Sequence, residues 1–161
     1  MIQPVNQNHI KECVDVIKES FLTVANEFGF TEKNAPRFTA FATTEQRLSW
    51  QLNHESRPMY AFVADGNIVG YYSLALQENQ ECELNNLCVV PRFRHQGIGE
   101  KLLFHSFDMA KSMGCSKMKI GIVEENQILR KWYESFGFRH IETKKFGFFP
   151  FACGYMELIL T

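Results

Sequence analysis

The sequence predicts an α+β fold, with a mixed, mostly antiparallel central sheet and flanking helices. Two strand-like runs, residues 59–64 and 68–76, are separated by Asp65-Gly66-Asn67, and Asp-Gly between such runs favours a hairpin. Residues 82–123 read as strand, helix, strand, an order that requires a crossover and a locally parallel pair. The length of 161 residues fits one domain, which we expect to cover residues 1–161.

The N-terminal third is expected to be mainly helical. Residues 1–5 are predicted to form a short strand, after which Asn6 or Asn8 could cap a helix. Apolar side chains then recur at spacings of three and four, the helical period, at Ile10, Cys13, Val14, Ile17 and Phe21. The periodicity weakens over residues 29–58, where Thr43 and Gln46 resemble a capping box that opens a short helix.

The remaining chain alternates strands and helices. The strand at residues 82–90 ends at Pro91, and Gly114 and Gly137 stand where helices commonly end in a left-handed residue. The predicted order is a helix over residues 97–113, a strand over 117–123, a helix from Asn126 to Phe136, and strands near 138–144 and 154–160.

Charge and composition exclude several classes of partner. The chain is 45% hydrophobic and 22% charged, which is typical of a soluble globular protein. Its formal net charge of −1 provides no broad positive field, so we expect neither nucleic acid nor a membrane surface as a partner. Any site for an anion must therefore be local.

The cysteines and the N-terminus indicate a cytoplasmic protein. The five cysteines are odd in number and lack a C-x-x-C pair, which argues against a disulfide framework and a zinc site. His9, His54, His105 and His140 show no metal-ligand spacing, so we expect no metal. The first residues lack the pattern of a secretory leader, and no stretch is apolar enough to span a membrane.

Gly97 and Gly99 stand at the start of the helix that follows Pro91, and they suggest a phosphate site. Glycines at a helix start leave the first-turn N–H groups accessible, and these donors with the helix dipole attract anions. A nucleotide P-loop would need Ser or Thr after Lys101, and a dinucleotide fold would need a third glycine where Leu102 stands. The turn is therefore of another kind, in which Arg94 could add a cationic clamp.

The turn at residues 94–99 reads Arg-His-Gln-Gly-Ile-Gly. It resembles the signature of the GCN5-related N-acetyltransferase (GNAT) superfamily, which is Gln or Arg, x, x, Gly, x, Gly or Ala. Residues 87–91, Leu-Cys-Val-Val-Pro, are similar to that family's L-x-V-x-P strand end. Residues 126–138 resemble its N-x-x-A-x-x-F-Y-x-x-x-G-F segment, with Leu129 and Trp132 as mild departures. The three motifs occur in the family's order and together cover about residues 59–161.

The resemblance implies acetyl-CoA as the acyl-donor cosubstrate. In this family the parallel strand pair is splayed, and the pantetheine arm binds the strand backbone within the gap while the pyrophosphate binds the glycine turn. Asn126 either only caps its helix or also holds the pantetheine. The implied cofactor-binding residues are Leu87, Cys88, Val89, Arg94, His95, Gln96, Gly97, Ile98, Gly99 and Asn126.

The resemblance also implies direct attack of an amine on the thioester. Tyr133 is then the candidate acid for the departing thiolate, and a backbone N–H near Val89 the candidate oxyanion donor. Glu83 is the candidate base, with Glu81 as its rival and a water relay as the alternative. Strand periodicity is expected to place Glu83 and Leu87 on one face, and Cys88 is expected to be a buried hydrophobe rather than a nucleophile.

These expectations converge on an acetyl-CoA-dependent N-acetyltransferase whose acceptor is a primary amine of a small molecule or peptide. The rivals are a non-catalytic CoA-binding regulatory module and an O-acyltransferase or user of longer acyl chains. A homodimer through sheet-edge pairing stays open. Two phenylalanine groups, at residues 28–41 and 146–151, are expected to be core, with an apolar acceptor pocket as the alternative.

Overall fold

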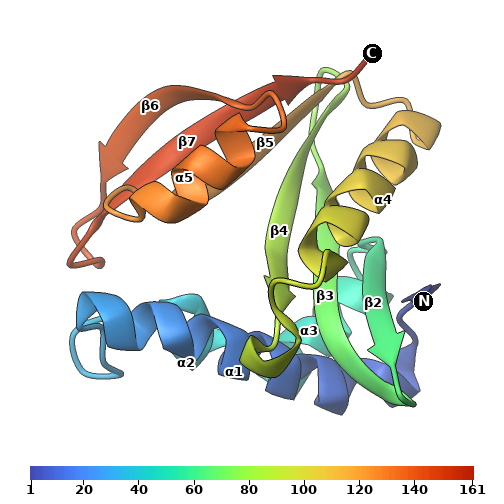
Figure 1. Cartoon of the computed structure of the whole chain (residues 1–161), viewed down its shortest axis with the longest axis horizontal. Helices are drawn as coiled ribbons and strands as arrows, with labels where there is room; N and C mark the ends of the chain where they lie inside the picture. Colours follow the sequence, from blue (N-terminus) through green and yellow to red (C-terminus); the bar gives the residue numbers. More distant parts are fainter.

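The computed structural model describes residues 1–161 and confirms the mixed α+β class (Figure 1). One seven-stranded sheet has the order β1-β2-β3-β4-β5-β7-β6, in which only the β4–β5 pair is parallel. The elements are β1 (Ile2–Pro4), η1 (Gln7–His9), α1 (Ile10–Phe28), α2 (Thr39–Ala42), α3 (Glu45–Asn53), β2 (Met59–Ala64), β3 (Asn67–Leu76), β4 (Glu81–Val89), η2 (Pro91–Phe93), α4 (Ile98–Ser112), β5 (Lys117–Val123), α5 (Gln127–Glu134), β6 (Arg139–Lys145) and β7 (Ala152–Ile159).

Most predicted elements are present within a few residues of their expected ends. Strands β2 and β5 have the predicted bounds, and the hairpin between β2 and β3 turns at Asp65 and Gly66, both with positive φ. The predicted capping box is wrong by one residue: Thr44 caps α3 by accepting from the N–H of Arg47, whereas the Thr43 hydroxyl donates to the carbonyl of Thr39. No helix is both long and apolar enough to cross a membrane.

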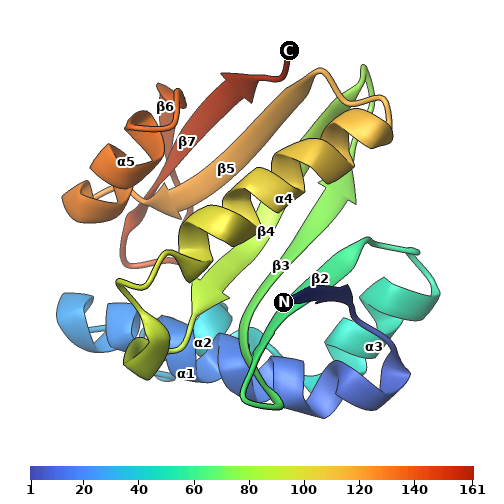
Figure 2. The same ribbon diagram turned by 45° about the vertical axis from the view of Figure 1, so that its right-hand side comes forward.

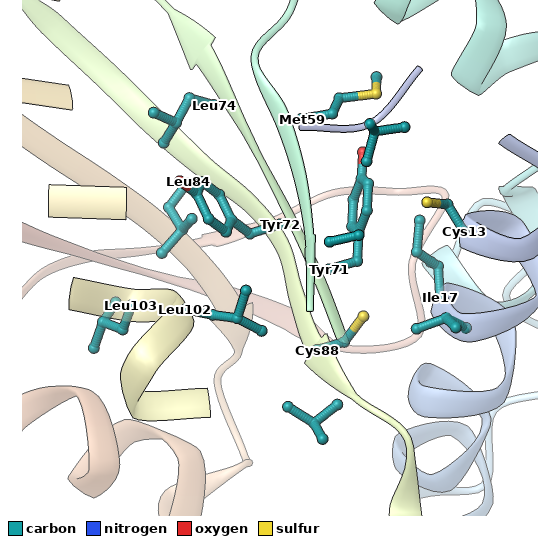
Figure 3. Packing of buried hydrophobic residues seen from close by; sticks show 14 of the residues in the cluster. Cys13, Ile17, Met59, Tyr71, Tyr72, Leu74, Leu84, Cys88, Leu102 and Leu103 are labelled. Carbon is teal, nitrogen blue, oxygen red and sulfur yellow. The ribbon is translucent and has the colours of Figure 1, made fainter. Parts of the chain in front are cut away.

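Helices cover both faces of the sheet. Helix α1 packs against β3 and β4 on one face, together with α2 and α3, while α4 packs against the same two strands on the other (Figure 2). Consecutive residues of β3 point to opposite faces: Tyr71 lies on the α1 side near Cys13 and Ile17, and Tyr72 lies on the α4 side (Figure 3). Both faces of β3 and β4 therefore contribute buried side chains to the core.

Strands β4 and β5 pair only at their beginnings and then separate. Their register runs from Glu81 opposite Lys117 to Glu83 opposite Lys119 and stops there. Beyond this point β4 pairs with β3 alone and β5 with β7 alone, and Figure 1 shows the two ribbons diverging toward their C-terminal ends. From Leu84 to Val89, β4 thus has a neighbouring strand on one side only.

A bulge in β4 changes which side chains share a face. Tyr71 is opposite Cys88 and Ser73 is opposite Asn85, so one extra residue lies between these pairs on β4, where Asn86 has φ of 55°. Residues directly opposite in a ladder share a face, so Glu83, Asn85 and Cys88 lie on the α1 side. The expectation that Leu87 shares the face of Glu83 is therefore wrong, because the inserted residue reverses the alternation.

A second, smaller core joins the two sides of the divergence. Phe30 and Phe38, from the region around α1 and α2, contact Phe151 at the start of β7, with ring centroids 4.6 and 5.8 Å apart. All three rings are buried, which agrees with the core interpretation of the phenylalanine groups. Phe148, in the β6–β7 connection, is the exposed member, and the Arg37 guanidinium lies 4.3 Å from its ring centroid.

Candidate active site

The turn before α4 presents unpaired backbone donors. His95 and Gly97 have φ of 62° and 81°, so the chain turns sharply and the helix begins at Ile98. The backbone N–H groups of His95, Gln96 and Gly97 have no backbone acceptor, and the first N–H groups of α4 have none within the helix. A Cβ at Gly97 would meet nothing within 4 Å, so the space over the turn is open. This set of donors suits the phosphates of a diphosphate group.

The side chain of Arg94 is largely engaged within the protein. Its Nε donates to the Val89 carbonyl at 2.8 Å, and its two terminal nitrogens donate to Thr23 Oγ1 at 3.1 Å and to the Ser20 carbonyl at 2.9 Å. Arg94 therefore ties α1 to the end of β4. Any contribution to an anion would come from the N–H groups that these bonds leave free.

Three residues at the end of β4 border the divergence. Cys88 is buried on the α1 side, where burial raises the pKa of its thiol to about 12, so the thiol stays protonated and is a poor nucleophile. Leu87 and Val89 alternate with Cys88 and lie on the α4 side, and Val89 approaches Gly99 at the start of α4. The backbone of this stretch is open toward β5.

Helix α5 places an aromatic pair beside this stretch. Asn126 caps the helix by accepting from the N–H of Leu129, which leaves its amide N–H₂ group available as a donor. Tyr133 is buried, and its hydroxyl has no hydrogen-bond partner within the protein. Burial, followed by the nearby Cys88 thiol, raises the pKa of Tyr133, so the phenol remains protonated at neutral pH. The Trp132 ring packs over Gly99 and so links α5 to the glycine turn.

Glu83 and Glu81 have opposite environments although they lie on one strand. Glu83 is mainly desolvated, which raises its pKa despite a hydrogen bond of 2.7 Å from Asn85. Glu81 forms ion pairs with Lys119 at 3.0 Å and Lys117 at 3.7 Å, and the hydrogen bond from Lys119 lowers its pKa. Of the two carboxylates, Glu83 has the environment that favours proton acceptance near neutral pH.

Glu83 lines a pocket of about 350 Å³ on the α1 side of β4. The rest of its lining comes from the segment before α2, from α2 and its C-terminal end, from α3, from Arg57 two residues before β2, and from the β4 bulge. Its polar and charged members include Arg37, Arg47, Gln51, Arg57, Asn85 and Asn86. Sequence reasoning missed the three arginines, because they lie in residues 29–58, where no motif marks them; their shared charge was the only signal available.

Comparison with known proteins agrees with this geometry. Residues 21–138 match the family model of the acetyltransferase (GNAT) family. The chain is 25% identical over 113 residues to an uncharacterized N-acetyltransferase of Mycobacterium bovis, a match covering 70% of this chain and 66% of that one. It is 34% identical over 77 residues to the ribosomal protein bS18-alanine N-acetyltransferase of Haemophilus ducreyi, covering 48% of this chain and 52% of the relative.

The fold matches solved acetyltransferases along the whole chain. PaiA N-acetyltransferase of Thermoplasma acidophilum, solved in complex with coenzyme A, superposes with a TM-score of 0.83 at 18% identity, covering 99% of this chain and 98% of that one. The glycine turn, the diverging β4 and β5 and the capped helix α5 all fall within residues 21–138. The chain therefore belongs to the GNAT acetyltransferase family.

Proposed function

We propose that this protein is an acetyl-CoA-dependent N-acetyltransferase that transfers an acetyl group directly to a primary amine of a small molecule or peptide. The observation that carries the proposal is the juxtaposition of two open backbone surfaces. The unpaired N–H groups at residues 95–97 follow β4, which is open toward β5, after the short helix η2, and Gly99 beside them lies against Val89 at the end of β4. One surface suits a diphosphate, and the other suits an extended chain that binds as an added strand.

The residues present fit acetyl-CoA. The amides from His95 to Gly99 would hold the pyrophosphate, the backbone of Leu87 to Val89 would bind the pantetheine arm, and Asn126 would offer its free amide donor to that arm. Bound acetyl-CoA supplies an activated acetyl thioester. The PaiA protein named above binds coenzyme A on the same fold.

The protein's own groups would then move two protons. Glu83, directly or through water, accepts a proton from the acceptor ammonium, since an amine needs a free lone pair to attack. A backbone N–H near Val89 stabilises negative charge that develops on the carbonyl oxygen. Tyr133 donates a proton to the departing thiolate, since a phenol is protonated at neutral pH, and the proton that the attacking nitrogen loses as the amide forms returns to the phenolate.

Calorimetry and a thiol-release assay test the proposal together. We expect purified protein to bind CoA in calorimetry and to release thiol from acetyl-CoA when a panel of primary amines is added. Binding without turnover on any amine or alcohol would instead indicate a regulatory CoA-binding module. Faster turnover with longer donors, or with alcohols, would indicate the other acyltransferase classes. No binding of CoA to folded protein would refute the proposal.

The relatives are named for different classes of acceptor. The Haemophilus ducreyi relative acts on a ribosomal protein alanine, whereas other relatives are named for thialysine and for streptothricin.

A homodimer through edge pairing would have to use β1 or β6, because these are the outer strands of the sheet. Strand β6 carries an arginine, a glutamate and, at its end, two lysines, and charge on an edge strand disfavours such pairing.

A further inference from the structure

The pocket beside Glu83 is strongly cationic. Arg37, Arg47 and Arg57 line it from three separate segments, and Glu83 is the only carboxylate among its lining residues. Its remaining polar lining consists of neutral hydroxyl and amide side chains, and its apolar part is small. A pocket of about 350 Å³ also lies within the range of small-molecule sites, roughly 300–1,000 Å³.

Two of the three guanidinium groups have no anionic partner. Arg57 is half-buried and is held between Glu55, at 2.8 Å, and the Asn85 side-chain oxygen, at 3.2 Å. The side chains of Arg47 and Arg37 form no hydrogen bond or ion pair, and the Arg37 guanidinium lies over the ring of Phe148. Arg47 lies in the first turn of α3 with Gln51 one turn later on the same helix face.

These cations are directed away from the proposed diphosphate site. Two of the three β4 residues that line the pocket, Glu83 and Asn85, lie on the α1 side of the sheet, whereas the glycine turn begins α4, which covers the opposite side. The two anion-attracting features are thus on different faces of β4.

We propose that the acceptor is a small amine that also carries an oxyanion, a carboxylate or a phosphate-like group. This inference rests on the proposed acetyl transfer. The planar guanidinium forks of Arg37 and Arg47 match the two oxygens of such a group. Glu83, in the same pocket, receives the amine end. The acceptor is therefore held at both ends, with its anionic group at Arg37 and Arg47 and its nitrogen at the carboxylate of Glu83.

A matched acceptor series tests this. The acceptors are glycine, 3-aminopropanoate and 4-aminobutanoate, each beside its carboxamide, together with 3-aminopropylphosphonate. Thiol release from acetyl-CoA gives kcat and KM for each. We expect one or more anionic members to exceed their neutral counterparts in kcat/KM by about tenfold or more, the effect of a hydrogen bond to a charged group. The phosphonate arm decides which oxyanion is preferred.

Arginine variants connect the preference to the pocket. Arg47→Gln, at an exposed position where folding should be retained, is expected to raise KM for the preferred anionic acceptor about tenfold and to reduce its advantage over the carboxamide. KM for acetyl-CoA should not change. Arg139→Gln on β6, exposed and outside the pocket, is the matched control and should behave as the wild type.

The outcomes separate the two proposals. Turnover without any anionic preference, or equal effects of Arg47→Gln and Arg139→Gln, would overturn the oxyanion inference and leave the acetyltransferase intact. If no amine is acetylated, thermal protection by 3-aminopropanoate and by 3-aminopropylphosphonate decides. Protection that Arg47→Gln abolishes would support the anion site alone, and no protection would overturn it.

Discussion

Glu83, the proposed general base, has two properties that suit this role. It lies at the edge of a pocket that a substrate can enter, and desolvation holds its pKa above the usual range for a glutamate. Glu81, two residues earlier, is neutralised by Lys117 and Lys119 and titrates at lower pH. The difference between them arises from neighbours, which spacing along a strand does not reveal.

Replacement of Glu83 should change the pH profile of the reaction. A base must be deprotonated, so kcat/KM of the wild type rises as pH passes upward through the raised pKa of Glu83. Glu83→Gln should remove this limb and lower kcat/KM at neutral pH by about a hundredfold or more. Glu81→Gln is the control and should keep the wild-type profile. If Glu83→Gln retains both rate and profile, water alone relays the proton.

The same substitution should stabilise the fold at neutral pH. A carboxyl whose pKa is raised by folding binds its proton more tightly in the folded state, so its stabilising effect is complete at low pH and declines as pH rises. Gln carries no charge at any pH. The melting temperature of Glu83→Gln should therefore exceed that of the wild type at pH 7, with the excess disappearing below pH of about 4. An equal excess at both pH values would contradict this assignment.

Tyr133 should matter for rate and little for folding. Its hydroxyl makes no hydrogen bond within the protein, so Tyr133→Phe leaves no partner unsatisfied. We expect kcat to fall about a hundredfold or more while KM for acetyl-CoA and the melting temperature stay near wild type. Steady-state kinetics with scanning calorimetry on the same preparation checks this. A normal kcat would show that the thiolate leaves without this acid.

Among the elements, the turn that begins α4 requires glycine at Gly97 more than at Gly99. Gly97 has φ of 81°, where a side chain costs about 1–2 kcal/mol, whereas Gly99 is helical and a Cβ there would lie 3.7 Å from Trp132, an ordinary contact. Gly97→Ala should lower the free energy of unfolding by about that amount and weaken CoA binding, and Gly99→Ala should change both little. Denaturation and calorimetry would contradict this if the two variants behaved alike.

At this scale the sequence predicted elements well where a local signal existed. Asp65-Gly66 marked the hairpin and Pro91 marked the end of β4, because both impose backbone conformations by themselves. The bulge at Asn86 could not be predicted, since one inserted residue leaves the composition of a strand unchanged while reversing its faces. Leu87 was consequently assigned to the wrong side.

For the molecule as a whole, the buried phenylalanines add a second apolar link, beside the larger core, across the gap between β4 and β5. Phe151 is 6% exposed and contacts Phe30 and Phe38 on the other side of the gap. Phe151→Ala should reduce the free energy of unfolding by about 3–5 kcal/mol. Phe148→Ala, 43% exposed in the same connection, is the control and should cost much less. Chemical denaturation of both variants checks this, and equal losses would show that the link lies elsewhere.

The sequence motifs lie on the side of the molecule proposed to bind the donor, and none lies on the side proposed to bind the acceptor. The proposed donor site consists of backbone N–H groups in a turn that favours glycine at Gly97, and this glycine is visible in the sequence. The proposed acceptor site depends on Arg37, Arg47 and Arg57, which line one pocket only because tertiary packing brings their segments together. Their proximity is a property of the fold and not of any segment.

A sheet that parts in its middle lacks the continuous ladder that usually unites its two ends. On the proposed function, the pantetheine arm acts as a temporary eighth strand and completes that ladder. Acetyl-CoA would therefore stabilise the fold as well as take part in the reaction. Because a ligand bound only by the native state shifts the folding equilibrium, resistance to proteases would follow the concentration of donor. The stability of the fold would then depend on the concentration of acetyl-CoA, through the gap between β4 and β5.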